Sequence, residues 1–190
     1  MAKQFERIEE AQRRFIERQK VFFTGTAAAD GRVNVSPKGL DSLRVLGPNR
    51  VAYLDLTGSG NETAAHLLAS GRMTLMFCAF EGPPMILRLY GRGRTLARGT
   101  PDYAELLPLW APEPLGARQI VLLEVDLVQT SCGYAVPLMD YREDRPNLGR
   151  WAAARTEQEL EAYRRQHNAR SIDGLPALGH ERGGDTALTS

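Results

Sequence analysis

The chain has 190 residues, of which 43% are hydrophobic and 25% are charged, as expected for an ordinary globular domain. Its 24 lysines and arginines nearly balance its 23 aspartates and glutamates, so no basic excess points to nucleic acid or an anionic membrane as partner. The two cysteines, Cys78 and Cys132, are too few and too far apart for a disulfide framework or a cysteine-based zinc site. The N-terminus is charged and no apolar run reaches membrane-spanning length, so we expect a cytoplasmic protein without a membrane partner.

In chain order, the first expected element is a helix over residues 3–18, where apolar residues recur at helical spacing among charged ones. Four short β-rich runs separated by turns follow, at 21–27, 32–36, 43–46 and 51–56. We expect the second run to end at Pro37, because proline has no N–H to give to a strand ladder. A short helix is then expected from Asn61, with Ser59 and Glu62 at the spacing of a capping box.

Further strands are expected after this helix, at 73–80, 85–97 and 119–128. Six or seven short strands with few long helices between them favour an antiparallel barrel over a doubly wound parallel sheet. The composition changes after Ser131, and an Ala-, Arg- and Glu-rich stretch predicts a second helix over 149–168. We therefore expect a barrel domain over residues 1–130, with a helical extension over 131–190 packed on the same domain.

The segment that joins the strand at 51–56 to the helix at Asn61 carries groups that can hold a phosphate. Two glycines allow close approach of the backbone, and the start of the helix adds unpaired N–H groups and the positive end of the helix dipole. The candidate contacts in this segment are Thr57, Ser59, Gly60, Asn61 and Thr63. The same residues also fit a helix cap that binds nothing, and the sequence leaves both interpretations open.

A second candidate segment follows the run at 32–36. Lys38 stands in a Pro/Gly turn, where its charge could meet a phosphate or a cofactor carbonyl, although a solvated turn lysine fits as well. Arg88, Arg92 and Arg94 share one face of a strand, which suits either a ligand- or subunit-facing surface or an outer polar face. The histidines have no metal-ligand spacing, so no metal site is expected.

Taken in order, these segments resemble the pyridoxamine 5'-phosphate oxidase-like family of FMN-binding split barrels, over roughly residues 15–130. The segments that carry the resemblance are Gly31–Lys38, Tyr53 with the Gly58–Asn61 turn, Arg72–Phe80 and Leu89–Arg94. Two later segments, at 131–137 and 171–176, are similar to a largely uncharacterised branch of the family. The resemblance implies a mainly β (α+β) fold, a six-stranded antiparallel split β-barrel with flanking helices. It also implies a homodimer with FMN held between the subunits.

The resemblance also implies which residues contact the cofactor. The residues facing the flavin ring and its ribityl-phosphate arm would be Asn34, Val35, Ser36 and Lys38. Those holding the phosphate region would be Thr57, Ser59, Gly60, Asn61 and Thr63. Further candidates, reaching across from the second subunit, are Arg88 and Trp151.

The function implied is that of an FMN-dependent oxidoreductase acting on an unidentified small molecule, with the flavin carrying the redox chemistry. Gly60 and Asn61 stand where the true oxidase has basic residues, and its substrate-holding C-terminal segment is replaced, so oxidation of pyridoxamine phosphate is not expected. No acid–base pair stands out, and no catalytic residue is assigned. The alternatives are a flavin- or haem-handling binding protein without turnover and a reductase that uses the deazaflavin F420.

Overall fold

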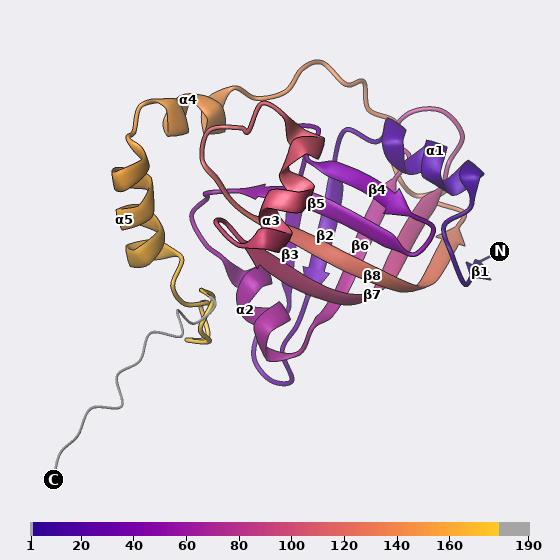
Figure 1. Cartoon of the computed structure of the whole chain (residues 1–190). Helices are drawn as coiled ribbons and strands as arrows, with labels where there is room; N and C mark the ends of the chain where they lie inside the picture. The colour runs from indigo at the N-terminus through magenta and orange to yellow at the C-terminus, as the bar shows by residue number, and fades with distance from the viewer. Residues whose placement is uncertain (1, 179–190) are drawn as a thin grey trace, which may run out of the picture.

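The computed structural model describes residues 2–178, and its main feature is one antiparallel sheet of eight strands that curls into an open barrel (Figure 1). The strands are β1 (Lys3–Phe5), β2 (Phe22–Thr26), β3 (Asn34–Lys38), β4 (Leu43–Gly47), β5 (Arg50–Leu56), β6 (Arg72–Cys78), β7 (Ile86–Ala97) and β8 (Ala117–Ser131). They lie in the order β3-β2-β6-β7-β8-β5-β4, with β1 added to β8. The curl brings the end of β3 against β5, where Lys38 reaches Asp55.

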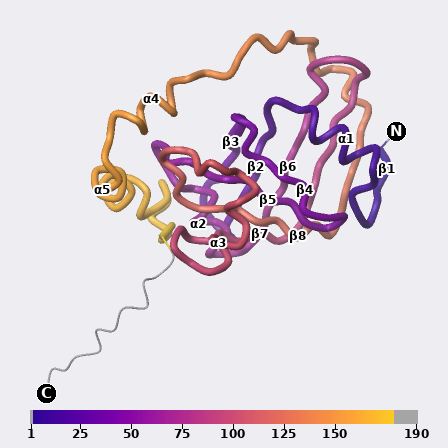
Figure 2. Tube along the Cα trace, turned by 45° about the horizontal axis from the view of Figure 1, so that its top comes forward, coloured from indigo at the N-terminus to yellow at the C-terminus, as the bar shows by residue number. Residues whose placement is uncertain are grey.

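The helices flank this sheet. Within the described residues they are α1 (Glu10–Arg18), α2 (Glu62–Ala69), α3 (Pro101–Leu106), α4 (Asn147–Ala153) and α5 (Glu157–His167), with a 3₁₀ turn at Leu107–Trp110. The coil after β8 passes over the barrel and carries α4 and α5 to the side opposite the N-terminus (Figure 1 and Figure 2). None of these helices is long and apolar enough to cross a membrane.

Two apolar clusters stabilise the sheet from its two faces. Inside the barrel, Phe22 stacks on Phe77 with ring centroids 5.8 Å apart and meets Tyr53 edge-on at 5.5 Å. On the outer face, Ile120 and its neighbours on β5 and β8 pack beneath Trp110 of the 3₁₀ turn. Burying a large apolar side chain contributes about 1.5–3 kcal/mol. β5 and β8, which are buried on both faces, are therefore firmly anchored supports for a site.

The predicted strands are found with their ends shifted by a few residues, but the predicted opening helix is wrong in its first part. Residues Lys3–Phe5 form β1 and pair with β8, and the helix begins only at Glu10. The reason lies in the length of β8, which pairs with β5 only as far as Glu124. Its remaining edge would be left without a hydrogen-bonding partner, and β1 fills that place. β1 raises the number of strands to eight, where the resemblance implied six.

Pro37 does not end its strand, contrary to expectation. It lies inside β3, opposite Phe23 of β2, and the strand continues to Lys38. β3 is at the end of the strand order, so among the described residues its outer edge has no neighbouring strand. Proline is tolerated on such an edge because its missing N–H has no ladder partner to satisfy.

The helix predicted over 149–168 is two helices, α4 and α5. Thr156 separates them and starts α5, where it forms a capping box with Glu159. The short helix α3 and the 3₁₀ turn after it were not predicted, because each spans too few residues to show a period. Residues 179–190 of the predicted extension lie outside the described residues.

Candidate functional site

A cavity of about 1120 Å³ opens beside the mouth of the barrel. Its inner wall comes from the ends of β3 and β5 and from the turn before α2, and its outer wall from the first turn of α4 and the coil before it. The apolar part of its lining includes Leu54, Leu56, Trp110, Leu115 and Leu148. Typical small-molecule pockets measure roughly 300–1,000 Å³, so this cavity is large enough for a cofactor and a further small molecule.

The inner wall contains a buried carboxylate between two cations. Asp55 is 2% exposed, and its two oxygens lie 2.7 Å from Lys38 Nζ and 2.9 Å from Arg118 Nε. Gln119 donates a further hydrogen bond of 2.8 Å to the same carboxylate. One negative charge thus faces two positive charges, and the cluster carries one excess positive charge at the inner end of the cavity.

The pKa of Asp55 shows which effect dominates in this cluster. Burial alone would raise the pKa, but the attraction of Lys38 and Arg118, with the hydrogen bonds from Lys38 and Gln119, lowers it to about 2. The carboxylate is therefore ionised throughout the physiological range.

A β-bulge explains how two successive side chains of β8 reach the same carboxylate. Asp55 pairs with Gln119 and Leu56 pairs with Ala117, which leaves Arg118 as the extra residue of the bulge. In a regular strand, neighbouring side chains point to opposite faces. The bulge removes this alternation and turns Arg118 toward the cavity, as bulges do near many functional sites.

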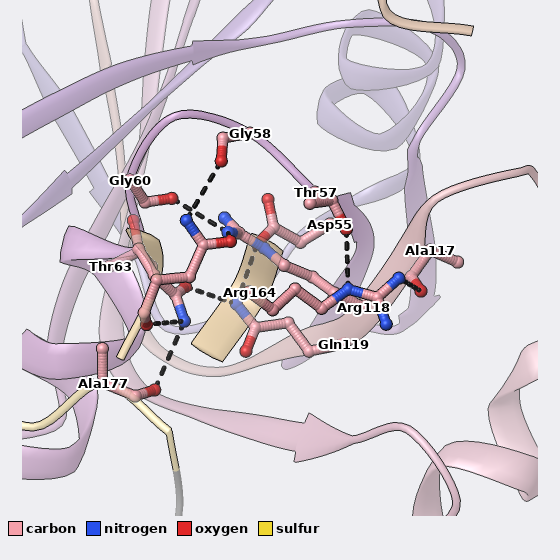
Figure 3. Close-up of polar contacts among 12 residues, drawn as sticks. Asp55, Thr57, Gly58, Gly60, Thr63, Ala117, Arg118, Gln119, Arg164 and Ala177 are labelled. Carbon is pink, nitrogen blue, oxygen red and sulfur yellow. Dashed lines mark hydrogen bonds and ion pairs between the residues drawn. The ribbon is translucent and has the colours of Figure 1, made fainter. Parts of the chain in front are cut away.

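The turn before α2 is fixed on both sides by hydrogen bonds (Figure 3). Arg118 Nη1 donates to the carbonyl of Gly60 at 2.9 Å and to Asn168 Oδ1 at 2.7 Å. Asn168 in turn donates to the carbonyl of Gly58 at 3.0 Å. The side chain of Asn61 donates hydrogen bonds to two carbonyls of the C-terminal segment and accepts one of 2.9 Å from Gln119. The turn is thereby held in shape by its own chain.

The loop after β3 contributes a strained backbone and an unpaired hydroxyl. Leu40 and Asp41 have positive φ angles of 59° and 51°, which cost non-glycine residues of order 1–3 kcal/mol each. Ser42 follows them in the lining of the cavity, and its hydroxyl is buried without a partner among the described residues. Trp110 holds this loop through a 2.7 Å hydrogen bond to the carbonyl of Ser42. A strained loop with an unsatisfied polar atom is typical of a ligand site.

The structure brings more than half of the predicted contact residues together in this cavity. The predicted residues that line it are Ser36, Lys38, Ser59, Gly60, Asn61 and Thr63. Ser59 is exposed, and its hydroxyl makes no hydrogen bond within residues 2–178. It does not cap α2: the capping position belongs to Asn61, whose side chain makes no cap bond. The predicted capping box of Ser59 and Glu62 is therefore wrong.

The other predicted residues do not line the cavity. The side-chain oxygen of Asn34 accepts a 3.0 Å hydrogen bond from the hydroxyl of Ser36, and Val35 is exposed. The buried hydroxyl of Thr57 donates to a backbone carbonyl of the neighbouring loop at 2.8 Å. Arg88 is on β7 and donates to a serine at the end of β8. Trp151 packs edge-on against a tyrosine of α5, with centroids 5.0 Å apart.

The central residues of the inner wall were missed in the sequence. Asp55 carried a signal, because it is a charged residue within the otherwise apolar run at 51–56. Arg118 carried none, since its direction depends on a bulge that the sequence pattern does not reveal. The same is true of Asn168, which reaches the turn only through the docking of the C-terminal segment.

Comparison with solved structures identifies the fold class as the split barrel. The structure resembles an H111A variant of HupZ from Group A Streptococcus, with a TM-score of 0.56 and 18% identity over 65% of this chain and 99% of that one. It also resembles a putative pyridoxamine 5'-phosphate oxidase from Lactobacillus delbrueckii, with a TM-score of 0.51 and 20% identity over 65% and 94% of the two chains. The predicted fold class is therefore confirmed.

Comparison of sequences then gives the family. Residues 8–132 match the pyridoxamine 5'-phosphate oxidase family. The chain is also 41% identical, over 191 aligned residues, to the pyridoxamine 5'-phosphate oxidase family protein ustO of Aspergillus flavus. This alignment covers 92% of this chain and 77% of that protein. This chain belongs to the pyridoxamine 5'-phosphate oxidase family, as its resemblance predicted.

Proposed function

We propose that this protein binds FMN in the 1120 Å³ cavity and acts as an oxidoreductase on a small molecule. The observation that carries the proposal is the excess positive charge formed by Lys38, Asp55 and Arg118 at the inner end of the cavity. Burying uncompensated charge is costly, so an anionic ligand group at this point would be stabilised strongly. A phosphate is such a group.

The residues present fit a flavin phosphate at the inner wall. Lys38 Nζ makes one hydrogen bond, and Arg118 Nη2 makes none within residues 2–178. Both cations therefore have N–H groups left to donate to a phosphate. The free hydroxyl of Ser59 stands in the adjacent turn. The apolar lining by Leu54 and Trp110 suits a flat ring. These cations take over the role that basic turn residues have in the true oxidase.

Bound flavin would supply hydride or electron transfer, and the residues of the chain would bind, orient and shield it. The fixed turn and the clamped guanidinium of Arg118 need no rearrangement to receive a phosphate, so little of the binding free energy is lost to ordering the site. The apolar walls restrict the access of water to whatever lies between them.

The proposal includes a two-fold homodimer with the cofactor groove near the contact. Its support is the edge strand β3, where Val35 is 64% exposed, together with Val33 just before the strand, which is 71% exposed. An edge strand with exposed valines in a single chain is an unprotected surface that a second copy can cover.

Titration of the ligand-free protein with FMN, riboflavin, F420 and haemin tests the cofactor. We expect saturable, stoichiometric binding of FMN, at least tenfold tighter than riboflavin, because only FMN brings the phosphate. Reduction of the loaded protein by a nicotinamide cofactor, with reoxidation by an added acceptor, then tests turnover. Tighter binding of haemin or F420 would replace FMN in the proposal, and FMN binding without reduction would make the protein a flavin carrier.

A further inference from the structure

The outer wall of the cavity differs from the inner wall in origin and in charge. It is built by residues 144–150, which follow the barrel in the chain. Pro146 and the half-buried Leu148 give it an apolar surface. Arg145 and Arg150 flank these residues in the sequence and also line the cavity.

The cations of the outer wall lack the compensation found on the inner wall. Asp55 holds both inner cations, whereas neither Arg145 nor Arg150 makes an ion pair or a side-chain hydrogen bond within residues 2–178. The arginines of the neighbouring α5 are, by contrast, paired with glutamates of that helix. Asp144 is the one carboxylate in this wall, so the two arginines leave it with a positive excess.

Space supports a second ligand at this wall. If the inner wall holds FMN as proposed above, on which this inference rests, a cavity of about 1120 Å³ still leaves room beside it. The remaining surface combines apolar residues with two guanidinium groups. This chemistry is complementary to an apolar body that carries an anionic group, since arginine binds carboxylates and phosphates through paired donors.

We propose that residues 144–150 form the substrate subsite, and that the substrate is a largely apolar, ring-sized molecule bearing a carboxylate or a phosphate. Arg145 and Arg150 hold its anionic group, and Leu148 packs against its apolar body. Trp110, across the cavity, offers a second apolar face. These are binding residues that select the substrate, and they take no part in proton transfer.

The test uses three probes of one shape, 2-naphthoate, 2-naphthyl phosphate and the neutral 2-naphthamide, titrated into the FMN-loaded protein by calorimetry. We expect at least one anion to bind more tightly than the amide. In Arg145→Gln/Arg150→Gln its dissociation constant should rise at least about tenfold, because charge-assisted bonds are lost. The amide should change less than about twofold, and so should FMN. The anion that binds more tightly identifies the group recognised.

Arg142→Gln is the matched control, because Arg142 is an exposed arginine of the same coil that does not line the cavity. It should leave all three probes unchanged. Equal binding of anions and amide by the unaltered protein overturns the proposal, as does an equal effect of Arg142→Gln. If Lys38→Met weakens binding of the anions more than Arg145→Gln/Arg150→Gln does, the anions bind at the inner wall, and the proposal is again overturned. If the protein does not bind FMN, the proposed function fails, and the same titrations without flavin still decide the subsite.

Discussion

At the scale of single residues, Asp55 determines how much charge its cluster with Lys38 and Arg118 presents. Its carboxylate is buried and ionised because Lys38 and Arg118 stabilise it at 2.7 and 2.9 Å. Removing one partner from a buried charge cluster commonly costs 3–5 kcal/mol, since the remaining charges lose their compensation. The carboxylate that forms ion pairs with both cations therefore also makes the stability of the barrel mouth depend on pH in acid.

The pH dependence follows from the sign of this shift. The pKa of Asp55 in the folded protein is about 2, below its ordinary value of 3.8, so its contribution to stability is present above pH 3.8 and lost as the pH falls through about 2. We expect a loss of about 2 kcal/mol from this group in that window. Urea unfolding at pH 7, 4, 3 and 2 measures it. Asp55→Asn should lack this component, whereas Asp102→Asn, on an exposed ion pair, should keep it.

Lys38→Met separates two roles for the lysine at the inner wall. Contact with the phosphate predicts that FMN binds at least about tenfold more weakly while riboflavin and the reduction potential hardly change. Contact with the ring predicts a lower potential with affinity kept. The position beside Asp55 leads us to expect the first result. Lys20→Met, outside this cavity, is the control. If neither quantity moves, Lys38 serves only Asp55 and the cofactor lies elsewhere.

At the scale of elements, the C-terminal segment holds the turn before α2 in place. Asn168 is 0% exposed and bonds both to Arg118 and to the carbonyl of Gly58. Asn168→Ala leaves these buried groups without partners, which should cost about 1–3 kcal/mol of stability. FMN should also bind more weakly, because Arg118 loses its orientation. Thermal unfolding and FMN titration check both effects. Asn147→Ala, at an exposed site, should change neither.

Elements differ in how far their sequence could predict them. The strands around β5 and β6 follow from alternation and turn residues, because both signals are local. β1 could not be found in this way, since Lys3–Phe5 becomes a strand only where the long β8 leaves an open edge. The site divides in the same manner. Lys38 and the turn residues stand in local motifs, whereas Arg118 depends on a bulge and Asn168 on contacts across more than a hundred residues.

At the scale of the whole molecule, we expect two copies to assemble through the edge strand β3. Light scattering should give about 42 kDa, twice the 21.1 kDa of the chain. Val35→Glu replaces an exposed apolar side chain of this edge strand with a charge and should shift the protein toward a monomer. Leu68→Glu, on an apolar residue of α2 that is 51% exposed, should leave the dimer intact. A monomer that still binds flavin at micromolar concentration would contradict this assembly.

The two walls of the cavity also differ in how freely they can change. Lys38, Asp55 and Arg118 sit on paired strands and depend on one another, so random replacement there should mostly abolish folding. Residues 144–150 are the end of a surface coil and the largely exposed first turn of α4, where sequence varies at little structural cost. A randomised library confined to 144–150 should therefore yield many folded, cofactor-competent proteins with new preferences. In such a molecule the capacity for chemistry is inherited with the barrel, while the choice of what it acts on can evolve separately.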